Sequence, residues 1–477
     1  MSRVFSAPSK ALLAGGYLVL DPAYSSFVTA LSARMYAVTS VEEANEASVI
    51  RVESPQFESG SWEYSFRIDD SQIPLVITEK NSKRNPFAEA TVHTLVNYVK
   101  PTQNYRIKVT IFSDSEYHTQ DGTRLESSTN GSKKFHWHTK PIDQVPKTGL
   151  GSSAGLVTVL TTALLSIYVP NFKCNDERSL LQIHNVAQIA HCIAQKKVGS
   201  GFDVAAATYG SIVYRRFEPA IITQLVSESH LLSLEDYHRE LRKVVLDTDW
   251  HFVTEKCSLP KGIRILMGDV AGGSETPKMV SQVLAWRSQK PEYSHEVWTS
   301  LNTANMALVD SLQNLKLLSE SDPHAYSELI SALQTYNVAQ IKNLASFSVD
   351  YAARFELIIN IVHSIENIRH WMRVMTRESG ASIEPSEQTI LLNNCNTVKG
   401  VLGGVVPGAG GYDAICLIVA ASSISSIIES TKGSGESSNL DLSSINKHQF
   451  DRVSWLDLTE QQDGVLEENL EDFKGLL

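Results

Sequence analysis

Several features that would place a chain in a familiar class are scarce or missing here. The 477 residues include five cysteines, an odd number, and these are widely spaced without a C-x-x-C pair. That pattern argues against a disulfide framework and a zinc site, and it indicates reduced thiols in a cytoplasmic protein. We find no internal repeat, and residues 1–20 lack the basic and then apolar pattern of a secretory signal.

The chain also has fewer positive than negative charges. The chain has 42 Lys and Arg against 53 Asp and Glu, a formal net charge of −11, so it has no basic surplus to neutralise a nucleic-acid backbone. An anionic substrate would have to be attracted by a local cluster of cations. The longest uncharged apolar stretches, about 155–169 and 414–428, are too short to span a membrane. The composition predicts a soluble protein with neither a nucleic-acid nor a membrane partner.

What the chain does contain is a segment rich in glycine and serine, Lys147–Gly155, followed at once by an uncharged stretch of helical character. Glycine lets a backbone come close to a ligand because it has no Cβ. The N–H groups of such a loop, with the positive end of the following helix dipole, can surround phosphate oxygens. The segment therefore predicts a nucleotide-phosphate site, with Ser152 or Ser153 available to touch a metal ion.

Three other interpretations of this loop have to be weighed. Gly149, Gly151 and Ala154 also fit the dinucleotide fingerprint G-x-G-x-x-G/A, but residues 143–148 do not predict the buried strand that should precede it. A Walker A loop needs Gly-Lys-Ser/Thr, and the chain has no Gly-Lys dipeptide. A glycine loop that simply enters a core helix stays open from this motif alone.

Apolar periodicity predicts a mixed α and β chain whose pattern resets near residue 220. We expect a domain boundary within about 220–260 and, accordingly, domains of 1–222 and 223–477. The N-terminal part predicts a strand at 3–7, a turn at 7–10 and a polar loop or hairpin at 113–134. The C-terminal part predicts long helices at about 276–290, 295–318, 324–342 and 350–378 and a final strand at 452–458.

Several titratable residues have both a structural and a functional interpretation. Asp203 follows a glycine-containing turn and, taken alone, is typical of a helix N-cap. His136 and His138 lie at strand spacing without a third ligand in sight, which favours surface histidines over a metal site. His184 and His191 share a helix face and are expected to be packing or partly exposed residues.

A second glycine loop, Pro407–Asp413, precedes another buried segment, and Pro8-Ser9-Lys10 lies near the N-terminus. In chain order, the segments 8–10, 149–154 and 408–411 resemble the first, second and third motifs of the GHMP kinases. This group includes galactokinase, homoserine kinase and mevalonate kinase. Within that group the chain resembles the fungal-type phosphomevalonate kinases. The similar stretches are 11–21, 145–165, 199–210, 272–278, 379–389 and 407–414.

The resemblance implies a two-lobed α+β fold, with a ribosomal S5 domain 2-like N-terminal lobe, a ferredoxin-like C-terminal lobe and an active site between them. It implies ATP and Mg²⁺ as cofactors. The implied reaction is phosphoryl transfer to 5-phosphomevalonate, in isoprenoid and sterol precursor synthesis. The expected partners are therefore small-molecule substrates, without an obligate protein partner.

The same resemblance assigns roles to residues of this sequence. The implied catalytic residues are Lys10 and Asp203. The nucleotide loop comprises Lys147, Gly149, Leu150, Gly151, Ser152, Ser153 and Ala154, with a hydroxyl of Ser152 or Ser153 toward the metal. Substrate contacts are assigned to Lys10, Tyr17, Ser200, Gly201, Ser274, Thr276, Lys278, Gly408, Ala409 and Gly410.

Three departures from the family pattern are visible. Ser9 replaces the glycine of the usual Pro-Gly-Lys, which would carry strain if that position needs a positive φ. Gly16 stands where many relatives have Glu. No Asp or Glu lies between Leu181 and Phe202, where mevalonate kinases place a metal-binding glutamate. Metal ligation is therefore expected to rely on a loop serine, the ATP phosphates and water.

The chemical nature of the phosphoryl acceptor determines the role expected of the Asp203 carboxylate. A phosphate monoester is already mostly a dianion at pH 7, so it needs little help from a base, and positive charge from Lys10 and Mg²⁺ should dominate. An alcohol acceptor would need Asp203 as a base. Mevalonate kinase is therefore the nearest rival, and a sensor of the same fold that binds nucleotide without turnover is the rival from another class.

Overall fold

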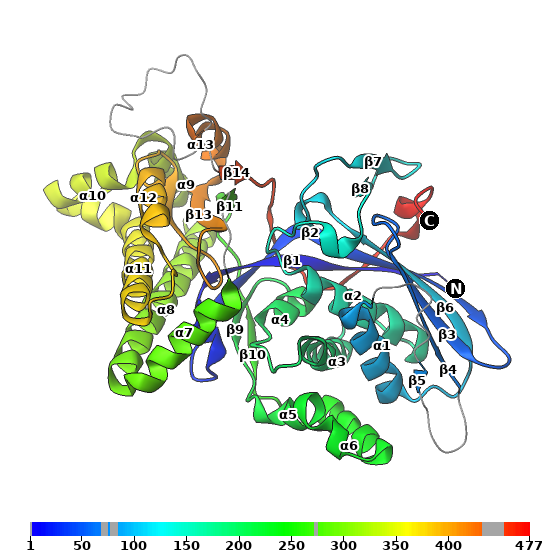
Figure 1. The fold of residues 1–477 in the computed structure, drawn as a ribbon. Helices are drawn as coiled ribbons and strands as arrows, with labels where there is room; N and C mark the ends of the chain where they lie inside the picture. The colour runs from blue at the N-terminus through cyan, green and yellow to red at the C-terminus, as the bar shows by residue number, and fades with distance from the viewer. Residues whose placement is uncertain (1, 68–74, 77–83, 271–274, 432–452) are drawn as a thin grey trace. The chain divides into compact units, whose positions relative to one another are not determined.

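The computed structural model describes residues 2–67, 75–76, 84–270, 275–431 and 453–477 (Figure 1). The strands are β1 (Val4–Ala14), β2 (Ser26–Glu43), β3 (Ser48–Glu53), β4 (Ser61–Phe66), β5 (Leu75–Val76), β6 (Tyr105–Ser113), β7 (Arg124–Ser127), β8 (Lys134–Trp137), β9 (Ile212–Arg215), β10 (Val253–Lys256), β11 (Ile263–Val270), β12 (Val401–Val405), β13 (Ala414–Ala420), β14 (Val453–Trp455), β15 (Glu460–Gln461) and β16 (Leu466–Glu468). The α-helices are α1 (Pro86–Val99), α2 (Ser152–Tyr168), α3 (Glu177–Gln195), α4 (Phe202–Tyr209), α5 (Ala220–Ser227), α6 (Leu234–Leu246), α7 (Thr276–Gln289), α8 (Pro291–Ser321), α9 (Pro323–Thr335), α10 (Val338–Phe347), α11 (Val349–Ser379), α12 (Ser386–Cys395) and α13 (Ile424–Thr431).

The contacts divide the chain into two compact units. Unit 1 comprises Met1–Lys10, Thr29–Lys256 and Gln461–Leu477, and unit 2 comprises Ala11–Val28 and Cys257–Glu460. These units differ from the expected consecutive domains of 1–222 and 223–477. The reason is strand pairing: β10 pairs with β9, and β16 returns from the C-terminus to pair with β1.

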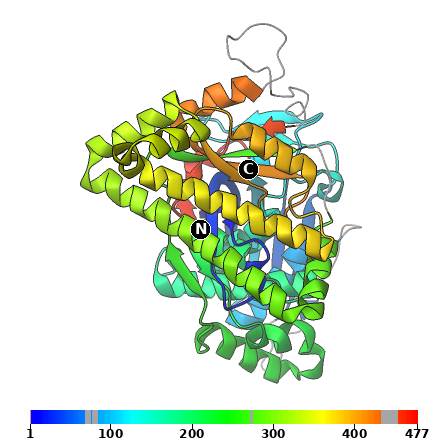
Figure 2. The same ribbon diagram turned by 90° about the vertical axis from the view of Figure 1, so that its left-hand side faces the viewer.

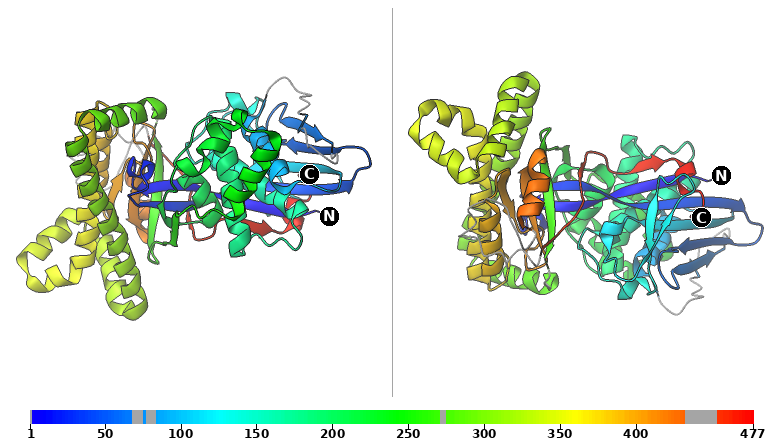
Figure 3. Two further views of the ribbon diagram at one scale, coloured as in Figure 1. Left: turned by 90° about the horizontal axis from the view of Figure 1, so that it is seen from below. Right: turned by 90° about the horizontal axis from the view of Figure 1, so that it is seen from above.

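Unit 1 is built on a large sheet with the strand order β10-β9-β2-β6-β3-β4-β5, to which β1 is added by pairing with β2 and β16. Helices α1 to α4 pack on one another and cover one face of this sheet (Figures 1 and 3). An aromatic cluster holds the β7–β8 hairpin and the C-terminus against the sheet, and it includes Tyr36, Phe112, Phe135 and Phe473. The sheet therefore presents the start of α2 and α4 on a rigid support.

Unit 2 has a four-stranded antiparallel sheet in the order β12-β13-β11-β14. The two long helices α8 and α11 lie side by side, and α11 packs against β12 (Figure 2). The core joins strand residues such as Leu417 and Val419 to Leu391 and Leu392 of α12. The loop between β12 and β13 is the second glycine-rich segment of the sequence.

Some sequence expectations are corrected by the structure. β1 runs without a break through 7–10, so the expected turn there is wrong, and Ser9 does not have a positive φ. The expected helix 324–342 is two helices, because Asn337 caps α10 in a capping box with Gln340. By contrast, the expected polar loop or hairpin at 113–134 is confirmed as a hairpin, because β7 lies within it and pairs with β8.

Two findings bear on the expected class of the protein. Cys174, Cys192, Cys257, Cys395 and Cys416 are all free and buried. Among the described residues, no helix combines the length and the apolar character that a membrane crossing requires.

Candidate active site

The segment predicted to bind phosphate forms a loop that ends at the first turn of α2. Gly149 and Gly151 have φ values of 76° and 88°, a left-handed conformation that residues with side chains rarely adopt. α2 begins at Ser152, its N-cap Gly151 has no side chain to accept a hydrogen bond, and its first turn carries no carboxylate. The first N–H groups of α2 are thus available to an outside acceptor, and the helix dipole favours an anion there.

Lys10 projects from β1 against this loop. Its Nζ donates a hydrogen bond to the carbonyl oxygen of Gly149 at 2.9 Å, and its backbone N–H donates to the carbonyl of Leu150 at 3.2 Å. A Cβ on Gly151 would lie 2.9 Å from Cε of Lys10, so a side chain at this position would displace the lysine from its place. Burial lowers the pKa of Lys10, while the negative charge of Asp203 raises it. The strand therefore holds a cation at the phosphate loop.

Asp203 lies in the first turn of α4, after Gly201 with its φ of 84°. One carboxylate oxygen, Oδ1, accepts a hydrogen bond from the Val204 N–H at 3.0 Å, and the other, Oδ2, lies 4.0 Å from Nε2 of His191. The N-cap of α4 is Gly201, so the interpretation of Asp203 as an N-cap is wrong. The carboxylate instead belongs to the group of polar side chains around Lys10.

His191 is a site residue that the sequence did not reveal. Its Nε2 lies 3.1 Å from Oγ of Ser153 and 3.1 Å from the amide nitrogen of Gln195, and the ring is buried. His191 therefore stands between the phosphate loop and Asp203. Its seven-residue spacing from His184 indicated packing only, and nothing in the spacing could predict which helix it faces.

The loop that precedes α4 is fixed by side chains of β9 and the residue after it. Nη2 of buried Arg216 donates to the carbonyl of Gly199 at 2.9 Å, and the hydroxyl of Tyr214 donates to the carbonyl of Ser200 at 2.8 Å. A Cβ on Gly201 would lie 2.9 Å from the Tyr214 hydroxyl. Ser200 and Gly201 thus belong to a fixed loop that leads directly into the first turn of α4, which carries Asp203.

Beside the phosphate loop, unit 1 contains a cavity of about 630 Å³. Its apolar lining includes Met35, Val52, Phe57, Trp62, Phe87, Ile111 and Leu156. Its polar lining includes His118, Ser152 and Ser153, the cations Arg84 and Lys147, and the carboxylates Glu58 and Asp143. A mainly apolar cavity with a few polar groups is typical of a small-molecule site. Another cavity of unit 1, of about 670 Å³, has Glu177, Asp247 and Asp249 in its wall, so its charge disfavours an anionic ligand.

His118 is a neutral histidine in the wall of the first cavity. Burial lowers its pKa to about 4, helped by the positive charges of Lys147 and His138. Its ring packs against Phe57 with centroids 5.0 Å apart, and His138 stacks on Phe57 at 4.8 Å. His138, expected at the surface, is half-buried by this stacking, and His136, also half-buried, contacts the hydroxyl of a threonine, Thr123, at 2.7 Å.

The loop between β12 and β13 corresponds to the third kinase motif and is called the third glycine loop from here on. It belongs to unit 2, and its residues Gly408, Gly410 and Gly411 have φ values of 68°, 81° and 112°. The hydroxyl of Tyr17 donates a hydrogen bond to the carbonyl of Ala409 at 2.8 Å. The structure therefore brings together the unit 2 residues of the first and third motifs, which lie almost 400 positions apart in the chain.

The segment assigned to the acceptor side is only partly described. Ser274 lies outside the described residues. Thr276 begins α7 and is exposed, and Nζ of Lys278 lies 3.3 Å from a carboxylate oxygen of Glu275, with both side chains in solvent. In the structure Lys278 is thus an exposed cation near the start of a helix.

The residues near the phosphate loop suit a metal ion that is held mainly by its nucleotide. Within the described part of the chain, no group of three or more His, Cys, Asp or Glu side chains is arranged to hold a metal. Mg²⁺ commonly keeps several waters and binds one or two protein groups plus substrate phosphates. The hydroxyls of Ser152 and Ser153 at the start of α2 fit that kind of site, whereas an all-protein cage does not.

Comparisons with known proteins identify the family. A family profile described as the GHMP kinases N terminal domain matches residues 123–211. The phosphomevalonate kinase of Candida albicans is 45% identical over 480 residues, covering 100% of both chains, and that of Gibberella zeae is 35% identical, covering 87% of both.

One solved structure extends the comparison to the fold. The Streptococcus pneumoniae phosphomevalonate kinase, in complex with phosphomevalonate and AMPPNP, has a TM-score of 0.56 at 14% identity, with 96% of this chain and 99% of that one covered. This likeness concerns the fold and confirms the expected α+β GHMP kinase architecture. The identity to these fungal kinases, over the full length of the Candida enzyme, settles the family: the chain belongs to the phosphomevalonate kinases of the GHMP kinase superfamily.

Proposed function

We propose that this chain transfers the γ-phosphoryl group of ATP to the phosphate of 5-phosphomevalonate, giving 5-diphosphomevalonate and ADP, in the mevalonate route to isoprenoids and sterols. The observation that carries the proposal is the position of Lys10. Its ammonium lies 2.9 Å from the Gly149 carbonyl of the phosphate loop and within the field of Asp203. Membership of the phosphomevalonate kinase family supports the choice of acceptor.

The nucleotide is proposed to occupy the cavity beside the phosphate loop. The base and ribose would pack among the apolar residues, which include Phe87 and Leu156, and the phosphates would run toward the start of α2. Lys147, at the mouth of the loop, adds positive charge on the phosphate side. This arrangement is supported by the free N–H groups at Ser152, which suit phosphate oxygens.

Mg²⁺ bound to the nucleotide would neutralise charge on the phosphates. The protein's own contribution there is proposed to be a hydroxyl, from Ser152 or Ser153. Ser153 is already oriented by His191, whose Nε2 is 3.1 Å from its Oγ. Asp203 approaches the same ring nitrogen, with Oδ2 4.0 Å from Nε2 of His191, and can orient water near that point.

The acceptor phosphate needs positive charge more than it needs a base. Two polyanions must approach with the transferred group in line, and a preorganised cation offsets their repulsion. We assign that role to Lys10, with Asp203 holding the ammonium in place. Acceptor contacts are further assigned, from the family resemblance, to Tyr17, Ser200, Gly201, Thr276, Lys278, Gly408, Ala409 and Gly410, and also to Ser274 outside the described residues.

A cytoplasmic enzyme acting on small molecules, without an obligate protein partner, completes the proposal. Five free, buried cysteines suit a reducing compartment. The net charge of −11 disfavours a nucleic-acid partner.

The first test is ADP release from Mg-ATP with 5-phosphomevalonate and, in parallel, with mevalonate. Turnover with the phosphorylated acceptor alone supports the proposal. Turnover with mevalonate alone would move the chain to the alcohol kinases and make Asp203 the base. ATP binding without turnover of either acceptor would identify a sensor.

A further inference from the structure

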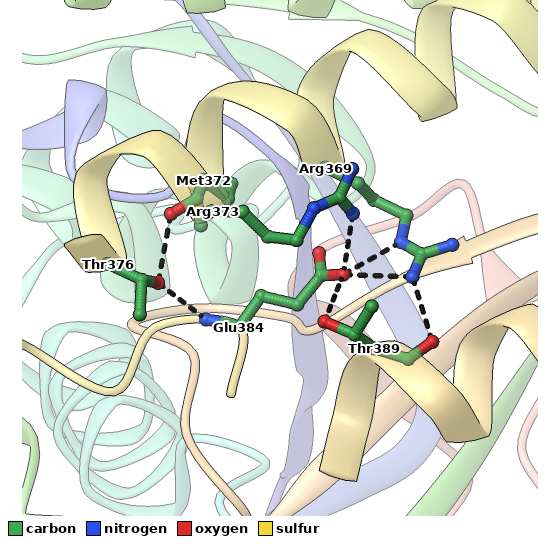
Figure 4. Close-up of polar contacts among 6 residues, drawn as sticks. All are labelled: Arg369, Met372, Arg373, Thr376, Glu384 and Thr389. Atoms are coloured by element: carbon green, nitrogen blue, oxygen red, sulfur yellow. Dashed lines mark hydrogen bonds and ion pairs between the residues drawn. The ribbon is translucent and has the colours of Figure 1, made fainter. Parts of the chain in front are cut away.

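A buried charge cluster lies where the C-terminal part of α11 meets the start of α12 (Figure 4). One carboxylate oxygen of Glu384 accepts hydrogen bonds from Nε and Nη2 of Arg369 at 3.1 and 2.8 Å, from Nη1 of Arg373 at 2.9 Å, and from the Thr389 hydroxyl at 3.1 Å. The side chains of Glu384 and Arg369 are only 2% and 4% exposed, and Arg373 is 33% exposed. Two guanidinium groups thus share one buried carboxylate.

The same cluster also fixes the backbone. The N–H of Glu384 donates to Oγ1 of Thr376 at 3.1 Å, and that hydroxyl donates to the carbonyl of Met372, one turn earlier in α11, at 3.0 Å. Nη2 of Arg369 also donates to the carbonyl of Thr389 in α12 at 3.2 Å. Both the main chain and the side chain of Glu384 therefore hold the segment between α11 and α12 through hydrogen bonds (Figure 4).

The third glycine loop rests on this segment. The N–H of Gly411 donates to the carbonyl of Ile383 at 2.9 Å. A Cβ on Gly410 would lie 2.2 Å from that same carbonyl oxygen, so the two backbones are as close as glycine permits. Ile383 is the residue immediately before Glu384. A displacement of the Glu384 backbone would consequently be passed directly to the loop.

Buried ion clusters are a poor source of net stability, because desolvation offsets much of the attraction, but the surrounding fold depends on their geometry once they are present. Here the ion cluster fixes the backbone on which the third glycine loop rests. We infer that Glu384, with Arg369 and Arg373, is a positioning residue that fixes the third glycine loop for binding of the anionic acceptor. The part of this inference that concerns the acceptor rests on the proposed function.

Hydrogen exchange tests the positioning without any substrate. In Glu384→Gln, the Gly411 amide should exchange roughly tenfold faster than in the wild type, relative to the Leu417 amide of the central strand β13, since local opening and global unfolding expose different amides. The matched control is Glu460→Gln, which removes another largely buried carboxylate of unit 2, paired with Arg264 at 2.6 Å. This control should change overall stability and leave the Gly411-to-Leu417 ratio unchanged.

Kinetics test the consequence for the acceptor. In Glu384→Gln the KM for 5-phosphomevalonate should rise roughly tenfold or more, because a small misplacement of binding groups is costly, while the KM for ATP stays within about twofold. Thr389→Val, which removes one of the donors to the same carboxylate oxygen, should move both readouts in the same direction by less. It keeps the inference testable if Glu384→Gln does not fold.

The outcomes separate the inference from the proposed function. An unchanged Gly411-to-Leu417 ratio in both cluster variants overturns the positioning role. Faster Gly411 exchange with an unchanged acceptor KM upholds the mechanical link and overturns the assignment of the loop to the acceptor. A wild type that turns over neither acceptor refutes the proposed function, and the exchange experiment still decides the positioning role.

Discussion

Gly16 and Gly408 are in such close contact that neither a glutamate nor an alanine fits at position 16. The carbonyl oxygen of Gly408 lies 2.6 Å from where a Cβ on Gly16 would be. The sequence departs here from the many relatives that have Glu. In this chain the third glycine loop occupies the space that a side chain at position 16 would need.

Gly16→Ala should therefore disturb the third glycine loop. A Cβ at 2.6 Å from a backbone atom cannot be accommodated by a side-chain movement, so we expect a loss of about 1–3 kcal/mol in the free energy of unfolding. The acceptor KM should rise and the ATP KM should change little. Urea denaturation and steady-state kinetics measure both effects.

The control for this variant is Gly122→Ala. Gly122 has a φ of 68°, and no atom lies within 4 Å of the position that a Cβ would take there, so its substitution costs backbone strain alone, about 1–2 kcal/mol. It should leave both KM values unchanged. Wild-type stability and kinetics in Gly16→Ala would show that the loop yields without consequence.

Lys10 should give the enzyme an alkaline limit below that of an ordinary lysine. Burial lowers the pKa of Lys10 from 10.5, so its charge is lost as the pH rises through this lowered value, and kcat/KM for ATP should fall there. Lys10→Arg cannot titrate in this range, and the fall should disappear in that variant. An identical alkaline limb in Lys10→Arg would assign the titration to another group.

Lys10→Met separates catalysis from stability at the same residue. Loss of the cation should lower kcat by roughly a hundredfold or more. Because the folded state disfavours the ammonium, the unfolded chain binds the proton more tightly, and removal of the charge should not destabilise the fold. Thermal denaturation of Lys10→Met checks this. An inactive variant that is also markedly less stable would indicate a structural lysine.

The motifs could be predicted from the sequence because each one depends on local rules. Glycines at 149 and 151 and serines at 152 and 153 indicate a tight loop before a helix, and the structure places them so. His191 could not be predicted, because its contact with Ser153 depends on how α3 packs against α2. Glu384 could not be predicted either, since its partners come from two helices, α11 and α12, and the glycine loop reaches the neighbouring Ile383 only through tertiary packing.

The cavity proposed for the nucleotide could not be predicted from the sequence for the same reason, because it depends on tertiary packing. Its apolar residues come from several strands, two helices and the loops between them, and in the sequence they look like ordinary core residues. The break between α9 and α10 escapes prediction for a different reason: Asn337 is a local signal, but the apolar period continues across it. Motifs formed by neighbouring residues can thus be predicted from this sequence, whereas contacts between residues brought together by tertiary packing cannot.

Ser153 should matter more than Ser152 for the metal. Its Oγ is held by His191 at 3.1 Å, on the side of Asp203, whereas no hydrogen bond of the Ser152 hydroxyl is seen among the described residues. Ser153→Ala should raise the Mg²⁺ concentration for half-maximal velocity roughly tenfold, and Ser152→Ala should change it far less. Mn²⁺ binding in the presence of ADP, followed by electron paramagnetic resonance, gives a readout without turnover. The reverse order of the two variants would place the metal at Ser152.

Leu156→Trp should close the cavity proposed for the nucleotide while leaving the phosphate loop in place. Leu156 lies one turn into α2 and lines the cavity of about 630 Å³, so an indole there competes with the base for the same space. We expect the affinity for AMPPNP, measured by calorimetry, to fall roughly tenfold or more, the loss that follows when an apolar pocket no longer admits its ligand. Leu156→Ala enlarges the cavity at the same position and should bind with a much smaller loss. If the tryptophan variant bound AMPPNP as the wild type does, the base would have to lie elsewhere in unit 1. The cavity lined by Glu177, Asp247 and Asp249 would be a poor alternative, because its carboxylates repel the phosphates.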